Sequence, residues 1–318
     1  MQDFAGRIAV VTGGGTGMGR ELVVQLAEAG AHVSTCDLSE EAMAETASLA
    51  RAAAPASDVR ISTHRCDVSD EAAMAVFRDE VLDAHGGDHV NLLFNNAGLS
   101  GGGSLFTDSR DSWDRCFDVC FGGVRWGTLA FLDALVAADE AHIVNTSSVN
   151  GFWASIGSDR PHTAYSAAKF AVKGFTEALI TDLAVNAPHV RASVVMPGHI
   201  GTSIVGNSVR FGHRDLTPEE REAAIAADRM FHDLAPMSAA AAATVILDGV
   251  RADRWRILVG DDAHALDAAV RANPETAYDP GFGDVLFAEI RAATEALGEA
   301  ADDALADGSA DDAARDGS

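Results

Sequence analysis

Short apolar runs alternate with helix-length stretches along most of the chain, and this rhythm constrains the fold more than any other feature. Many of these runs are apolar nearly throughout, as strands buried on both faces of a sheet are. Connections long enough for a helix are what parallel pairing requires. We therefore predict an α/β fold with a doubly wound, seven-stranded parallel sheet. The predicted strands are IAVVT (8–12), HVSTC (32–36), VRISTHRC (59–66), VNLLFN (90–95), HIVNTS (142–147), VRASVVM (190–196) and RILVG (256–260).

Two segments depart from this rhythm. Residues 201–236 contain no strand-like run, but Thr217-Pro218 and the acids that follow indicate the start of a helix. We expect this segment to form a lid inserted before the last strand. Residues 298–318 are rich in acids and almost lack large apolar groups, which predicts a disordered tail. The remaining residues, 1–297, are expected to make one domain.

Charge and cysteine usage limit the partners and the compartment. The chain has 48 acidic and 23 basic side chains, and a net charge of -25 repels both phosphate backbones and anionic head groups. We therefore expect neither nucleic-acid nor membrane partners. The four cysteines form no CxxC pair and the histidines no metal motif, so we expect free thiols and no metal site. Without a signal peptide or an apolar run of about 18 residues, a cytoplasmic protein is predicted.

A glycine-rich turn follows the first predicted strand. The segment TGGGTGMG (12–19) places Gly13, Gly17 and Gly19 before a helix-like stretch, with Thr16 and Met18 between the glycines. Glycines there allow a tight turn and close backbone approach, so that a pyrophosphate can lie on the helix N-terminus. A glycine turn alone also occurs in ordinary strand-to-helix loops. A second feature is needed to predict a Rossmann-type dinucleotide site.

Asp37 supplies that second feature, because it ends the second predicted strand, 24 positions after Gly13. A ribose-binding acid is expected about 20 residues beyond the glycines. A carboxylate there accepts hydrogen bonds from both ribose hydroxyls and repels a 2′-phosphate, which favours NAD over NADP. The loop itself contains no Arg or Lys, although Arg20 lies just beyond it and leaves NADP open.

The segment YSAAK places Tyr165 and Lys169 four residues apart on one face of a predicted helix. A free phenol has a pKa near 10, and a nearby ammonium lowers that pKa by favouring the phenolate. A surface Tyr and a surface Lys are the alternative interpretation. Against it, 21 of the 23 basic residues are Arg, and Lys169 and Lys173 are the only lysines. A compact ammonium at this position indicates a role that a guanidinium cannot fill.

These motifs, in this order, resemble the short-chain dehydrogenase/reductase family over roughly residues 5–260. The resemblance also rests on Asp67-Val68, NNAG (95–98), the serine strand IVNTSS (143–148) and PGHIGT (197–202). It implies that Tyr165 is the general acid/base, that Lys169 binds the nicotinamide ribose and lowers the Tyr165 pKa, and that Ser148 donates a hydrogen bond to the substrate oxygen. It also implies cofactor contacts from Asp67, Val68, Asn95, Ile200 and Thr202.

The chain departs from the family pattern at two places. Cys120 stands where the family usually has a proton-relay Asn, and a thiol is a weaker hydrogen-bond partner than an amide. A buried small side chain is an equally open interpretation of Cys120. The spacing of 17 residues from Ser148 to Tyr165 exceeds the usual one. The longer loop makes Asn150, Phe152 and Trp153 candidate substrate contacts, or Phe152 and Trp153 pack against the lid.

We therefore expect an NAD-dependent oxidoreductase that transfers hydride between NAD and a secondary alcohol or ketone, apolar and medium-sized. One alternative is an NAD-binding sensor or scaffold without turnover. Another is a sugar-nucleotide epimerase or dehydratase, which the TGxxxGxG spacing and the lack of a sizeable second domain disfavour. Family members commonly form dimers or tetramers, and the apolar helices expected near 110–137 and 162–186 fit such a homo-oligomer.

Overall fold

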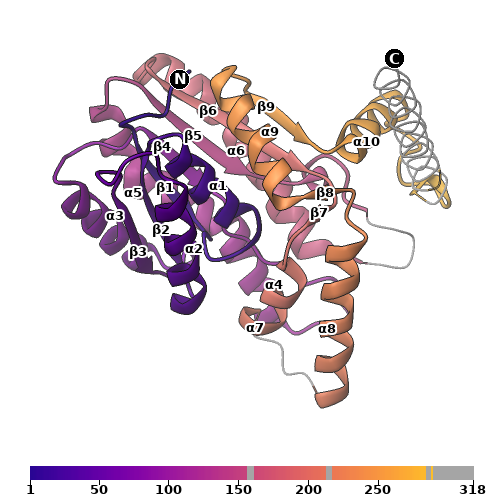
Figure 1. The fold of residues 1–318 in the computed structure, drawn as a ribbon. Helices are drawn as coiled ribbons and strands as arrows, with labels where there is room; N and C mark the ends of the chain where they lie inside the picture. Colours follow the sequence, from indigo (N-terminus) through magenta and orange to yellow (C-terminus); the bar gives the residue numbers. More distant parts are fainter. Residues whose placement is uncertain (156–160, 213–216, 284–287, 289–318) are drawn as a thin grey trace, which may run out of the picture.

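The computed structural model describes residues 1–155, 161–212, 217–283 and 288. A seven-stranded, fully parallel sheet forms its centre, in the order β3-β2-β1-β4-β5-β6-β9 (Figure 1). Every predicted strand is present, with ends within two residues of those expected. The strands are β1 (Ile8–Thr12), β2 (His32–Asp37), β3 (Ile61–Arg65), β4 (Leu92–Asn95), β5 (Ala141–Thr146), β6 (Val190–Pro197) and β9 (Arg256–Val259).

The helices cover both faces of this sheet, as the doubly wound fold requires. One apolar core lies under α1 and α9 and includes Leu22, Leu26 and Ile246. The other lies under α3, α5 and α6 and includes Phe77 and Phe131. The helices are α1 (Gly17–Glu28), α2 (Glu40–Ala53), α3 (Glu71–His85), α4 (Arg110–Phe117), α5 (Gly123–Ala137), α6 (Thr163–Asn186), α7 (Ile204–Phe211), α8 (Pro218–Asp233), α9 (Ala239–Arg251) and α10 (Asp261–Ala272).

The strand order reverses between β1 and β4. From β1 the chain first builds β2 and β3 on one side, then β4, β5, β6 and β9 on the other. The loops after β1 and β4 consequently leave the same edge of the sheet in different directions. Ligands of open α/β sheets bind at such a switch point, beyond the carboxyl ends of the strands. The glycine turn after β1 lies at this point.

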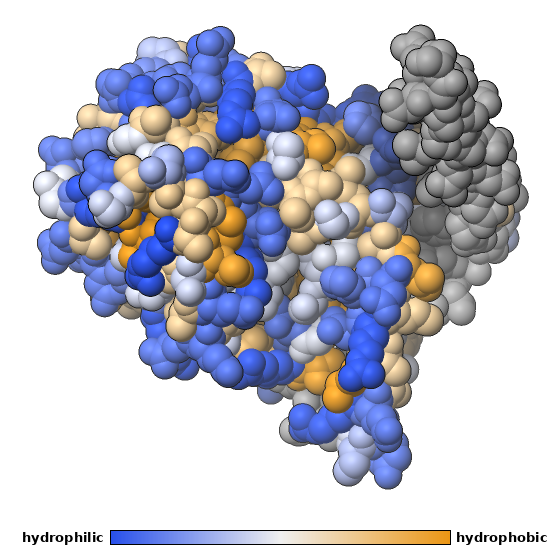
Figure 2. Space-filling model, in the orientation of Figure 1, coloured by the Kyte–Doolittle hydropathy of each residue, from blue (hydrophilic) through white to orange (hydrophobic). Residues whose placement is uncertain are grey.

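The 201–236 segment contributes α7 and α8. The predicted start of α8 is confirmed: Thr217 caps it, with Glu220 completing a reciprocal capping box. Short strands β7 (Ile200–Gly201) and β8 (Met237–Ser238) pair at the two ends of the segment. In Figure 1, α8 extends away from the sheet beside α7. Figure 2 shows apolar residues among polar ones in this region, in keeping with the exposed Ile225, Met230 and Leu234.

The helix expected near 110–137 is interrupted in the middle. A single π-helical turn, Asp118–Gly122, joins α4 to α5. Within the described residues, Arg110–Ala137 is one helical run long and apolar enough to cross a membrane by length and composition, which the sequence prediction had not anticipated. Half of its most apolar window is buried inside the protein, as expected for a core helix packed on a sheet.

The predicted tail, 298–318, lies outside the described residues. All four cysteines are within the described part, where each is buried and none forms a disulfide.

Candidate active site

A cavity of about 1060 Å³ lies at the switch point of the sheet. Its volume is at the upper end of the roughly 300–1,000 Å³ usual for ligand sites. Loops after β1, β2, β3, β4, β5 and β6 form its walls, together with α7, α8 and α10. Fifteen of the predicted site residues line it: Gly13, Thr16, Gly17, Met18, Gly19, Asp37, Asp67, Val68, Ser148, Asn150, Trp153, Tyr165, Lys169, Ile200 and Thr202.

The glycine turn forms a cradle that side chains would fill. Gly13 and Gly17 have φ of 69° and 56°, a conformation that favours glycine. A Cβ on Gly19 would lie 2.0 Å from the Gly13 carbonyl oxygen. The first turn of α1 carries no acidic side chain, and its N-cap residue, Thr16, makes no side-chain cap. The helix N-terminus therefore offers backbone N–H groups to an anion, which fits the pyrophosphate of a dinucleotide.

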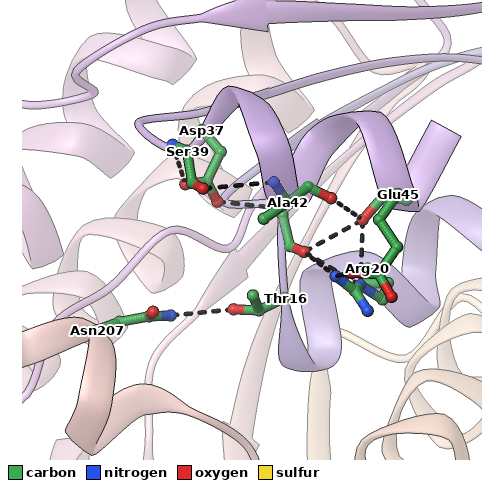
Figure 3. Close-up of polar contacts among 9 residues, drawn as sticks. Thr16, Arg20, Asp37, Ser39, Ala42, Glu45 and Asn207 are labelled. Atoms are coloured by element: carbon green, nitrogen blue, oxygen red, sulfur yellow. Dashed lines mark hydrogen bonds and ion pairs between the residues drawn. The ribbon is translucent and has the colours of Figure 1, made fainter.

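Asp37 lies beside this cradle at the end of β2 (Figure 3). Its Oδ2 accepts a hydrogen bond from the Gly15 backbone N at 3.0 Å, and its Oδ1 accepts one from Ser39 N at 3.1 Å. Arg20 is held on the other side of the loop. Its Nη2 donates to the Gly15 carbonyl at 2.9 Å and pairs with Glu45 Oε2 at 2.6 Å. The guanidinium thus already has an anionic partner.

Asp67 and Val68, which follow β3, also line the cavity. Arg115, buried on α4, donates through Nη1 to Asp67 Oδ2 at 2.9 Å and to Ser69 Oγ at 2.6 Å. Burial raises the pKa of Asp67, but the hydrogen bonds from Arg115 and Ser69 outweigh it and hold that pKa below its usual value. Asp67 is therefore an anion with a fixed orientation at neutral pH.

Ser148, Tyr165 and Lys169 line the same cavity. Ser148 follows β5, and its side chain acts on the Tyr165 phenol so as to lower the pKa of that phenol. The buried Lys169 amine donates to the Thr146 carbonyl at 2.9 Å and lies 5.3 Å from the centre of the Tyr165 ring. The neighbouring Ser147 donates instead to the Lys169 backbone carbonyl at 2.7 Å. Both serines follow the end of β5 and both line the cavity, but they have different hydrogen-bond partners.

The electrostatics of Tyr165 differ from the expectation. Burial raises the pKa of the phenol, and Cys120 raises it further, while the hydrogen bond from Ser148 lowers it by less. The predicted lowering by Lys169 is absent. Its amine is directed at the Thr146 carbonyl and lies over the ring rather than at the hydroxyl. The phenol is consequently neutral over the physiological pH range, as a proton donor must be.

Cys120 lies inside the π-helical turn. Its Sγ donates to the Leu99 carbonyl at 3.1 Å and accepts from Leu99 N at 3.4 Å. The thiol of Cys116, one turn earlier, donates to the same carbonyl at 3.6 Å. Together they tie the π-helical turn to the loop after β4. The adjacent Cys116 side chain and the nearby charge of Lys169 lower the pKa of Cys120, against the effect of burial.

The loop after Ser148 is placed differently from the prediction. Trp153 lines the cavity but packs against Leu266 and Ala277 of the C-terminal region instead of the 201–236 segment, and its Nε1 donates to the Ala277 carbonyl at 2.9 Å. Phe152 does not line the cavity, because its ring packs in the same cluster and lies under Arg256. Asn150 Nδ2 donates to the Trp153 carbonyl at 3.0 Å and so braces the loop.

Known proteins are similar to this chain in sequence and in fold. The family model described as short chain dehydrogenase matches residues 7–211. The chain belongs to the short-chain dehydrogenase family. The oxidoreductase SadH of Mycobacterium tuberculosis is 36% identical over 274 residues, which cover 85% of this chain and 92% of SadH. Levodione reductase of Leifsonia aquatica is 32% identical over 219 residues, covering 68% and 76% of the two chains.

Two solved structures bear on the cofactor. A short-chain dehydrogenase from Burkholderia phymatum in complex with NAD has a TM-score of 0.75 and 32% identity, and the alignment covers 87% of this chain and 95% of that one. A metagenomic short-chain oxidoreductase in complex with NADP has a TM-score of 0.54 and 32% identity, covering 61% and 83%. Short-chain dehydrogenases use a nicotinamide cofactor, and these neighbours include both forms of it.

One predicted cofactor contact of the family, Asn95, lies behind the cavity rather than on its wall. Its Nδ2 donates to Asn145 Oδ1 at 2.9 Å and to Thr128 Oγ1 at 3.2 Å, so the amide joins β4, β5 and α5. Its neighbour Asn96 lines the cavity instead, with Nδ2 donating to the Thr12 carbonyl at 3.1 Å. The register at the end of β4 decides which of the two adjacent Asn side chains faces the cavity.

Sequence reasoning did not identify several residues that line the cavity. Arg115, Asn207 and Leu266 come from α4, α7 and α10, far apart in the chain. His199, given no catalytic role, also lines it, and its ring binds the Phe231 carbonyl of α8 through Nε2 at 2.6 Å. No local pattern marks these residues, because only the tertiary fold brings them to the cavity.

Proposed function

We propose that this short-chain dehydrogenase transfers hydride between NAD and a secondary alcohol or its ketone, with Tyr165 as the general acid/base. The observation that carries the proposal is that Ser148, Tyr165 and Lys169 line the same cavity as the glycine cradle and Asp37. A cavity of this size can accommodate a dinucleotide whose nicotinamide end lies beside the three side chains.

When bound, the dinucleotide supplies the hydride, or accepts it, at its nicotinamide ring. In ketone reduction, Ser148 donates a hydrogen bond to the carbonyl oxygen and Tyr165 gives its proton to that oxygen as charge develops on it. In alcohol oxidation the phenolate takes the proton back. Lys169 is buried and anchored to the Thr146 carbonyl, and in the proposal its amine lies near the phenolate and binds the nicotinamide ribose.

NAD is the proposed cofactor form. The Asp37 carboxylate is oriented by Gly15 N and Ser39 N, and we infer that it accepts hydrogen bonds from the adenosine ribose hydroxyls. A 2′-phosphate there would meet its negative charge. Arg20, the residue that left NADP open, is bound to Glu45 and to the Gly15 carbonyl. This cation is therefore not available to neutralise an additional phosphate.

The proposed substrate is apolar and medium-sized. The apolar residues that line the cavity include Trp153, Leu266, Met230, Phe231 and Leu234. Such walls bind an alkyl or ring system through its apolar surface and provide few hydrogen bonds for a sugar. The relative named levodione reductase is in keeping with a carbonyl substrate. The segment 201–236, which supplies Met230, Phe231 and Leu234, acts as the lid of this site in the proposal.

The test is a panel of secondary alcohols with NAD, and of ketones with NADH, followed by the absorbance of NADH. We expect turnover with apolar substrates, and little with polyols. Binding of NADH without turnover of any member would favour the alternative of a sensor. Activity with NADPH at least equal to that with NADH would contradict the cofactor choice.

The proposed assembly is a homodimer or homotetramer in a reducing cytoplasm. Exposed apolar side chains on α5 and α6 include Leu129, Val136 and Phe170. Trp113, Phe117, Phe121 and Phe175 form a continuous row of ring contacts across α4, the π-helical turn and α6. A second copy would cover these groups. Analytical sedimentation at micromolar concentration distinguishes a homodimer or homotetramer from a monomer.

A further inference from the structure

The helix α7 makes a side-chain contact with the glycine cradle. Asn207 Nδ2 donates to Thr16 Oγ1 at 2.9 Å, across 191 positions of sequence (Figure 3). Both residues line the cavity. Neither side chain belongs to the reacting group of Ser148, Tyr165 and Lys169. The contact therefore joins the 201–236 segment to the part of the cavity that fits a pyrophosphate.

This hydrogen bond determines what the Thr16 hydroxyl can do. Thr16 is the N-cap residue of α1 but its side chain makes no cap, so its hydroxyl oxygen accepts no N–H of the helix. Because Oγ1 accepts from Asn207, its own O–H remains to donate into the cavity. The Asn207 amide has a second N–H, to which the described residues offer no acceptor. The Thr16 hydroxyl and the second Asn207 N–H are therefore two donors without an acceptor among the described residues, beside the N-terminus of α1.

The position of Asn207 is held by its neighbours on α7. Ser208 Oγ accepts from Ser100 N at 2.7 Å, and Gly206 N donates to Asp228 Oδ1 of α8 at 2.7 Å. At the end of the helix, Arg115 Nε donates to the Phe211 carbonyl at 3.4 Å. These bonds attach α7 to the loop after β4, to α8 and to α4. The amide at Asn207 is consequently presented by an anchored helix.

We propose that Asn207 is a further cofactor-binding residue, which donates to the pyrophosphate and positions the Thr16 hydroxyl to do the same. The inference rests on the proposed dinucleotide binding and adds to it a residue of the lid. Since the donor is carried by α7, release of the cofactor requires α7 to move away. In this proposal α7 of the 201–236 segment therefore binds the pyrophosphate rather than the substrate.

The experiment measures dissociation constants for three ligands: NADH, ADP-ribose, which has the pyrophosphate, and adenosine, which lacks it. Asn207→Ala should weaken NADH and ADP-ribose about 10-fold and adenosine less than about 2-fold, because charge-assisted hydrogen bonds to an anion are lost. Asn207→Asp should weaken ADP-ribose further, because a carboxylate would face the pyrophosphate. Asn186→Ala, on the exposed end of α6, is the matched control and should change none of the three.

A second variant tests the positioning role. Thr16→Val should weaken ADP-ribose, and combining it with Asn207→Ala should cost less than the product of the two single effects, because the residues act as a unit. Melting temperatures of the ligand-free variants within a few degrees of wild type establish that they fold.

The inference is overturned if Asn207→Ala leaves ADP-ribose binding within about 2-fold of wild type, or weakens adenosine equally. Failure of the proposed function is recognised separately, because the wild-type protein would then bind neither NADH nor ADP-ribose.

Discussion

At the scale of single residues, the proposed chemistry depends on the Tyr165 phenol, which keeps its proton at neutral pH. The sequence suggested that Lys169 makes Tyr165 more acidic, yet burial dominates and raises the pKa of the phenol. The spacing in YSAAK places the two groups on one face of α6, as predicted. It could not show that the amine turns toward the Thr146 carbonyl, because that carbonyl comes from β5.

The raised pKa of Tyr165 predicts opposite pH dependences for ketone reduction and alcohol oxidation. Below a raised pKa the phenol is protonated, so ketone reduction has its proton donor at neutral pH. Alcohol oxidation needs the phenolate, whose fraction increases about tenfold per pH unit below the pKa. We expect kcat/KM for oxidation to rise steadily from about pH 6 to about pH 9, while that for reduction stays level or falls. An oxidation rate independent of pH over this range would contradict the assignment.

A second prediction concerns Glu45, which holds Arg20. Glu45→Gln removes the anionic partner, so the guanidinium becomes free to approach a 2′-phosphate. The ratio of NADH to NADPH affinity should fall by about 3- to 10-fold, mostly through stronger NADPH binding. Glu41→Gln, an exposed residue on the same helix, makes the same charge change and should leave the ratio unaltered. An equal ratio in both variants would show that Arg20 has no part in the selection.

At the scale of helices and strands, local sequence predicted the sheet well and the irregular elements poorly. In β1 every residue is buried, so its sequence is a continuous apolar run, and the same reasoning identified the other strands. The π-helical turn at Asp118–Gly122 has no such signal. The packing of α10 and Ala277 on Trp153 has no local sequence signal either, because it depends on contacts between residues more than a hundred positions apart.

The π-helical turn is the element where the two interpretations of Cys120 can be separated. Because its thiol bonds both backbone groups of Leu99, we expect Cys120→Ala to lower the free energy of unfolding by about 1–2 kcal/mol. If the thiol is structural, turnover should slow by less than about 3-fold. Denaturant unfolding and steady-state kinetics measure the two effects. Turnover slowed by about 100-fold with unchanged stability would instead indicate a proton relay through Cys120.

For the whole molecule, buried histidines predict the response to acid. Burial lowers the pKa of His85, His142 and His162 to about 4, from 6.5. The unfolded chain binds protons at these three histidines more readily than the folded chain does. Each histidine therefore contributes stability above about pH 6.5 that is lost as pH falls toward about 4. For His142, 1% exposed, the lowering corresponds to at most about 3 kcal/mol.

The melting temperature should therefore fall from about pH 7 to about pH 5, and His142→Gln should reduce this fall. His264→Gln is the control, because His264 is exposed on α10. A melting temperature that is constant over this interval would show that the histidines are protonated in the folded protein.

The proposed function of the whole enzyme depends on Tyr165 exchanging a proton with the substrate at the nicotinamide end of the cavity. The most decisive experiment combines NADH binding with turnover for Tyr165→Phe, using Tyr278→Phe, the other tyrosine of the chain, as the control. We expect NADH affinity within about 3-fold of wild type and turnover reduced at least about 1,000-fold for Tyr165→Phe, with both largely retained for Tyr278→Phe. Turnover by Tyr165→Phe within about 10-fold of wild type would show that another group moves the proton.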